Sequence, residues 1–132
     1  MSATGPVVLD ASAVLALVYR EPGHDQVLDR LPGAVISSVN WAEIVAKLAQ
    51  RQHPDPAAAA EAVRALGIEV IAFSTAHAVR AGLLWSSTRA AGLSLGDRAC
   101  LALAAATPDA VTLTSDRAWV NLAIDTTIQL IR

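Results

Sequence analysis

The sequence predicts an α/β protein whose central sheet is mostly parallel and flanked by helices. Short apolar runs rich in β-branched residues alternate with longer stretches of helical spacing, which is typical of β–α–β crossover units. Proline and glycine separate many of these stretches. The chain has 132 residues, of which 54% are hydrophobic. That is enough for one core, so we expect a single domain over residues 1–132.

Five segments are predicted to be strands. The first, PVVLD, places three β-rich apolar residues in succession, as in a strand buried on both faces. The other four have similar apolar runs bounded by turn residues, and they cover residues 34–38, 68–73, 110–115 and 126–132.

Helices are predicted between these strands. Val14, Leu15, Leu17 and Val18 recur at helical spacing. Proline or glycine ends several of the helical stretches, and Pro56 suits the first turn of another. The predicted helices cover residues 11–20, 24–31, 40–52, 56–67, 74–92, 93–108 and 116–123.

Four acidic residues stand at junctions of these elements. Asp10 and Asp116 follow strands, whereas Glu43 and Asp97 open predicted helices. Such junctions meet at the carboxyl edge of a parallel sheet, where four carboxylates would repel one another by about 4 kcal/mol per close pair. A cation would relieve this repulsion, and oxygen ligands favour Mg²⁺ or Mn²⁺. Metal-activated hydrolysis of a phosphodiester is the chemistry that such a cluster best supports.

Each acid taken alone also has a structural explanation. Asp10 fits a helix N-cap, and the spacings Asn40–Glu43 and Ser94–Asp97 fit capping boxes. Capping and metal binding are compatible, because the N-terminus of a helix favours negative charge. The convergence of all four acids on one edge therefore favours the metal site.

Small polar residues accompany the acids. Ser12, Asn40 and Thr114 are placed to orient carboxylates or a metal-bound water, although capping or turn roles explain them equally well. Arg98 and Arg117 directly follow two of the acids, and each can either contact a phosphate or pair with a carboxylate.

The remaining features bear on the environment of the chain. Cys100, the single cysteine, lies in an apolar run and is expected to be buried, which suits a reducing cytosol. No apolar run approaches the roughly 18 residues that span a bilayer, and the N-terminus lacks the basic flank of a signal peptide. We therefore expect a cytoplasmic protein. The net charge of −2 argues against a nucleic-acid partner, but neutralising four acids would make it positive.

The segments VVLDASAVLAL, SSVNWAEIVAKL, LSLGDRACLALA and TLTSDRAW together resemble the PIN-domain family, and in particular the VapC toxins of type II toxin–antitoxin systems. Each segment contains one of the four acids. The resemblance covers essentially the whole chain, and the four motifs in this order are fairly specific. Residues 20–33 and 51–92 match less distinctively.

The resemblance implies a PIN-type three-layer α/β/α sandwich. It also implies an endoribonuclease that uses Mg²⁺ or Mn²⁺ to cut structured RNA, often tRNA or ribosomal RNA. The catalytic and metal-binding acids would be Asp10, Glu43, Asp97 and Asp116. The protein would form a homodimer, for which Trp85 is a candidate surface residue, and a cognate VapB antitoxin would silence it. DNA would be bound only through that antitoxin.

Other functions remain open. A haloacid-dehalogenase-like phosphatase also begins with an apolar strand and Asp, but it needs a second Asp where this chain has Ser12. A receiver-like domain would need a Lys on a later strand, and the single lysine, Lys47, lies on a predicted helix. A catalytically silent PIN scaffold is the third alternative.

Overall fold

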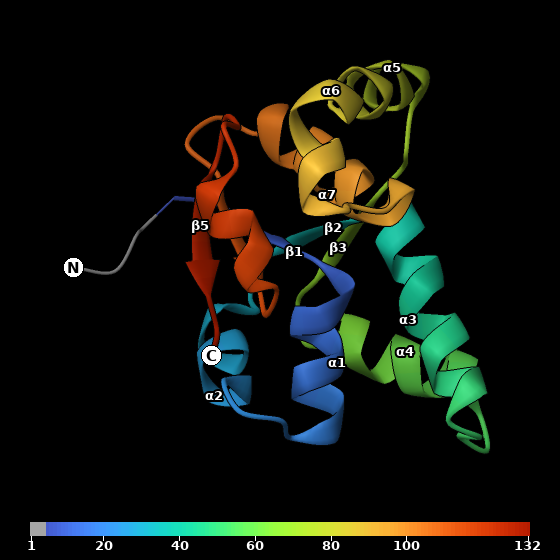
Figure 1. Ribbon diagram of the computed structural model, residues 1–132. Coiled ribbons are helices and arrows are strands. Elements are labelled where there is room, and N and C mark those ends of the chain that lie inside the picture. Colours follow the sequence, from blue (N-terminus) through green and yellow to red (C-terminus); the bar gives the residue numbers. More distant parts are fainter. Residues whose placement is uncertain (1–4) are drawn as a thin grey trace.

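A five-stranded parallel sheet forms the centre of the computed structural model, which describes residues 5–132 (Figure 1). The expectation that the N-terminus is not a signal peptide concerns mainly residues 1–4, which lie outside the described residues. All five predicted strands are present, and every pairing is parallel. Their order in the sheet is β3-β2-β1-β4-β5. The strands are β1 (Val7–Leu9), β2 (Val35–Ser37), β3 (Glu69–Ile71), β4 (Val111–Thr114) and β5 (Thr127–Leu130).

Helices cover both faces of the sheet, which confirms the predicted α/β/α architecture (Figure 1). On one face lie α1 (Ala11–Tyr19), α2 (His24–Arg30), α3 (Ser38–Gln50) and α4 (Pro56–Arg64). On the other lie α5 (Thr75–Leu83), α6 (Trp85–Thr88) and α7 (Leu95–Ala105). Two 3₁₀ helices, η1 (Arg89–Ala91) and η2 (Arg117–Asn121), complete the described elements. None of the helices in residues 5–132 has the length and apolarity needed to cross a membrane.

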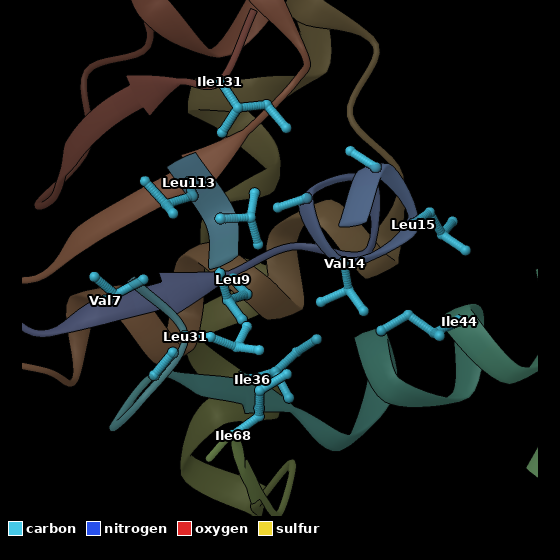
Figure 2. Packing of buried hydrophobic residues seen from close by; sticks show 14 of the residues in the cluster. Val7, Leu9, Val14, Leu15, Leu31, Ile36, Ile44, Ile68, Leu113 and Ile131 are labelled. Atoms are coloured by element: carbon cyan, nitrogen blue, oxygen red, sulfur yellow. The ribbon is translucent and has the colours of Figure 1, made fainter. Parts of the chain in front are cut away.

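Alternation along β1 divides the interior into two cores. Val7 and Leu9 pack with the helices of the first face, and Figure 2 shows them among Val14, Leu31 and Ile36. Val8 points to the opposite core, which contains Cys100 and Trp119. Successive strand residues face opposite sides, so a central strand covered on both faces must be apolar throughout. The contiguous apolar run of β1 follows from this.

The order in which strands are added to the sheet reverses between β1 and β4, although the two strands are parallel. From β1 it moves outward to β2 and β3, and then returns to place β4 on the other side of β1. Right-handed crossovers in opposite directions put their helices on opposite faces, as observed here. The carboxyl ends of β1 and β4 therefore flank the switch point, where open α/β sheets form their sites.

The prediction of one helix over residues 74–92 is wrong. The segment divides at Leu84 into α5 and α6, and then tightens into η1. The hydroxyls of Ser87 and Thr88 donate to the Leu84 carbonyl oxygen, at 3.2 and 2.7 Å. Ser and Thr side chains that bond to a backbone carbonyl three or four residues earlier bend helices. The short helix predicted at 116–123 is a 3₁₀ helix.

We expect replacement of Leu31 by alanine to lower the free energy of unfolding by about 2–5 kcal/mol, because it leaves a cavity in the core. Leu31 is fully buried, whereas Leu28 in the same region is 48% exposed. Leu28→Ala is the matched control and should change stability by no more than about 0.5 kcal/mol. Urea unfolding measures both, and equal losses would contradict the burial described here.

Candidate metal centre

Asp10 lies at the switch point, between the end of β1 and the start of α1. It is the N-cap of α1, and its Oδ1 accepts a hydrogen bond of 2.9 Å from the Ala13 N–H. The Ser12 hydroxyl donates to the same oxygen at 2.7 Å. The Thr114 hydroxyl, at the end of β4, donates to Oδ2 at 2.5 Å. Three donors therefore fix a carboxylate that is only 5% exposed.

Burial dominates the electrostatics of Asp10. Removal from water raises the pKa of this carboxyl from 3.8 to about 6, although the bonds from Thr114, Ser12 and Ala13 act to lower it. The negative charge of Asp97 contributes the smallest part of this rise. The ionised form of Asp10 is thus costly in the absence of a nearby cation.

The two hydroxyls also connect Asp10 to the segment after β4. The Ser12 oxygen accepts the Ser115 N–H and the Thr114 oxygen accepts the Asp116 N–H, both at 3.0 Å. The Asp116 carboxylate is exposed and caps η2 through the Ala118 N–H at 2.9 Å. The backbone of Asp116 is therefore tied to Asp10, while its carboxylate faces solvent.

Asp97 lies in the first turn of α7, as predicted. It forms a capping box with Ser94, whose N–H donates to Asp97 Oδ2 at 3.0 Å and whose hydroxyl accepts the Asp97 N–H at 3.2 Å. Asp97 Oδ1 accepts no hydrogen bond from the described part of the chain, so one oxygen is available to a ligand.

Glu43 departs from the prediction, because it does not open its helix. α3 begins at Ser38 with Ser37 as the N-cap, which places Glu43 inside the helix and rules out the predicted capping box. Instead, the amide of Asn40 donates to Glu43 Oε1 at 2.8 Å and to the Gly96 carbonyl oxygen at 2.9 Å. The contact with Gly96 carried no recognisable signal in the sequence.

The charges of three of the four acids act on one buried thiol. Burial raises the pKa of Cys100 well above its usual value, and the charges of Asp10, Asp97 and Glu43 each raise it further. The three carboxylates therefore share an electrostatic environment with this thiol. Within residues 5–132, however, no three His, Cys, Asp or Glu side chains are already arranged as metal ligands. The assignment of the four acids as ligands stays a prediction.

The chemistry of this donor set fits a hard divalent cation. The carboxylates of Asp10, Asp97 and Glu43 supply oxygen donors, which Mg²⁺ and Mn²⁺ prefer. A cation there would also offset the cost of ionising Asp10. Among the described residues, Arg98 and Arg117 form no salt bridge with any carboxylate. Of the two roles considered for these arginines, pairing with a carboxylate is therefore not observed among the described residues.

Most of the described chain matches a known protein family. Residues 7–125 match the family model described as the PIN domain. This range includes Asp10, Glu43, Asp97 and Asp116. A search of curated proteins found no match.

Several solved structures share the fold at low sequence identity. DNA-bound VapBC from Salmonella typhimurium has a TM-score of 0.73 at 16% identity, over 98% of this chain and 100% of that one. A toxin–antitoxin complex from Klebsiella pneumoniae gives 0.73 at 17%, over 96% and 98%. VapBC2 from Rickettsia felis, bound to a promoter DNA fragment, gives 0.71 at 15%, over 94% and 97%.

The pKa of Asp10 predicts how stability depends on pH without divalent cations. Between pH 3.8 and about 6 the folded chain keeps a proton that the unfolded chain loses, so the unfolding free energy falls as pH rises. At about 1.4 kcal/mol per pKa unit, the loss is of the order of 1–3 kcal/mol. Asp10→Asn should therefore have a larger free energy of unfolding than the parent at pH 7.5. This difference, the stability gap, should close near pH 4.

Urea unfolding in EDTA at the two pH values measures this gap. Asp125→Asn is the control, because Asp125 is exposed and should show no such pH-dependent gain. An Asp10→Asn gap of equal size at both pH values would contradict the pKa shift.

Proposed function

Because the chain belongs to the PIN-domain family, we propose that it is a VapC-type toxin, a metal-dependent endoribonuclease held inactive by a cognate VapB-type antitoxin. PIN domains are generally nucleases. The observation that carries the proposal is that the Asn40 amide ties the Glu43 carboxylate to Gly96, one residue before Asp97, while the charges of Asp10, Asp97 and Glu43 all act on the buried Cys100. Three negative charges there are unfavourable unless a cation and a substrate use them.

The proposed site consists of Asp10, Glu43, Asp97 and Asp116. A bound Mg²⁺ or Mn²⁺ would supply the positive charge that activates water and stabilises a phosphate in the transition state. Ser12 and Thr114 hold both oxygens of Asp10 in one orientation. The Thr114 oxygen also accepts the Asp116 N–H, which ties the backbone of Asp116 to Asp10.

The proposed reaction is hydrolysis of an RNA phosphodiester by water. The water oxygen forms a bond to phosphorus, the bond from phosphorus to O3′ breaks, and O3′ takes up a proton. The products are a 3′-hydroxyl and a 5′-phosphate. Attack by the 2′-hydroxyl would instead leave a cyclic phosphate, so the cut ends distinguish the two schemes.

The proposed partners follow from the family and the fold. Structures that share the fold at 15–17% identity are VapBC or toxin–antitoxin complexes, two of them with DNA. We infer a VapB-type antitoxin for this chain, with DNA bound only through it. The proposed substrate is structured RNA such as tRNA or ribosomal RNA. The proposed setting is the cytoplasm, with residues 1–132 acting as a single PIN domain.

Two alternative functions, a phosphatase and a silent PIN scaffold, make different demands on the chain. A haloacid-dehalogenase-like phosphatase needs an acid at position 12, where the Ser12 hydroxyl instead donates to Asp10. A silent PIN scaffold would keep the fold without cleaving RNA. Cleavage therefore separates the nuclease from both alternatives.

Purified protein without antitoxin should cut total cellular RNA at discrete positions with Mg²⁺ or Mn²⁺, and not in EDTA. Asp97→Asn should lower the rate at least about 100-fold, because it removes a ligand charge at nearly constant volume. Asp55→Asn is the control, because Asp55 caps α4 outside the cluster. Parent-like cleavage by folded Asp97→Asn would contradict the site.

A homodimer is also proposed, through the exposed apolar side chains of α5 and α6. Val79, Leu83 and Trp85 are 58%, 72% and 53% exposed. Exposed apolar groups of this size favour association. We expect a dimer by light scattering, and a shift to monomer for the double substitution Leu83→Ser with Trp85→Ser. Leu66→Ser, at a residue 52% exposed elsewhere, should leave the dimer unchanged.

A further inference from the structure

The Glu43 carboxylate occupies the space that a side chain at position 96 would fill. Gly96 is buried and is the second residue of α7. A Cβ atom added there would lie 2.6 Å from Glu43 Cδ and 2.7 Å from Oε1, and closer still to Oε2. Real Cβ atoms essentially never approach other heavy atoms within 3.0 Å. Any residue larger than glycine would therefore force the carboxylate to move.

Asn40 holds the carboxylate against this glycine. The side chain of Asn40 is 1% exposed, and its Nδ2 donates both to Glu43 Oε1 and to the Gly96 carbonyl oxygen. Two acceptors converge on one amide nitrogen, so the orientation of the amide is determined. One buried side chain thus ties the Glu43 carboxylate of α3 to the α7 backbone, one residue before Asp97.

We propose that Gly96 is a positioning residue for Glu43: its missing side chain provides the space in which the carboxylate is held against α7, one residue before Asp97. This inference rests on the proposed function, since it takes Glu43 as part of the cation site. Gly96 itself touches neither cation nor substrate in this scheme. Its effect passes entirely through the position of one carboxylate.

If Gly96 positions Glu43, a substitution at Gly96 should weaken cation binding without lowering the free energy of unfolding. Alanine in place of a helical glycine normally stabilises a helix, because glycine loses more backbone freedom on folding. In Gly96→Ala the new methyl group meets the end of a flexible side chain, which can swing away without unfolding the protein. The Glu43 carboxylate then leaves Asn40 and the site. The variant should stay folded and bind a divalent cation less tightly.

Gly82→Ala is the matched control. Gly82 lies inside α5, and a Cβ added there meets no atom within 4 Å. It offers the same gain in helix stability without displacing any carboxylate. A general effect of alanine on helices would change both variants alike.

The experiment measures Mn²⁺ affinity by titration calorimetry for the parent, Gly96→Ala, Gly82→Ala, Glu43→Ala and the double variant Gly96→Ala/Glu43→Ala. We expect Gly82→Ala to bind like the parent and Gly96→Ala to bind at least about tenfold more weakly. Gly96→Ala should cause no further loss when Glu43 is already absent. Parent-like binding by Gly96→Ala, or an equal additional loss in the Glu43→Ala background, would overturn the proposal.

A second readout separates this inference from the proposed function. If the parent binds no Mn²⁺, the metal-dependent function fails, but urea unfolding in EDTA of the same variants still tests the role of Gly96. Gly96→Ala should raise stability more in the Glu43→Ala background than in the parent, because no carboxylate has to be displaced. The same stability change in both backgrounds would show that Gly96 does not position Glu43.

Discussion

The buried carboxylate of Asp10 is the constraint on which the site depends. Its two oxygens are held by hydroxyls from Ser12 on α1 and Thr114 on β4, so both elements must meet beside the end of β1. The strand order supplies this, because β4 returns to pair directly with β1. A polar network buried at the switch point is favourable only when each member has a partner. The environment of the Asp10 carboxylate therefore depends directly on the pairing of β4 with β1.

Local signals in the sequence were sufficient for the strands and for part of the site. The apolar run 7–9 and the acid after it predict both β1 and the N-cap at Asp10, since each depends on neighbouring residues. The sequence does not predict the break at Leu84, because no proline or glycine stands between Leu83 and Thr88, and the bonds from the Ser87 and Thr88 hydroxyls depend on side-chain orientation. The start of α3 was misplaced because Ser37, rather than Asn40, is its cap.

Contacts between distant elements could not be read from one sequence. The amide of Asn40 reaches Gly96, 56 residues later, and local spacing carries no information about such a contact. Gly96 carries no local signal either, because the helix propensity of a glycine does not show what fills the space beside it. Asp10, Asp97 and Asp116 are easier to find, since each stands at a junction between elements, whereas Glu43 lies inside α3. The orientation of the Glu43 and Asp97 side chains depends on packing between α3 and α7.

The long separation between the two halves of the site has a consequence for protein synthesis. The Asp10 and Thr114 side chains are 104 residues apart in a chain of 132. A nascent chain therefore exposes Asp10 early but lacks the hydroxyl that completes its environment until translation is nearly finished. Contacts of such high sequence separation also form late during folding, because a long loop must close first. Truncated products released by a stalled ribosome before residue 114 would carry the first acids without a completed site.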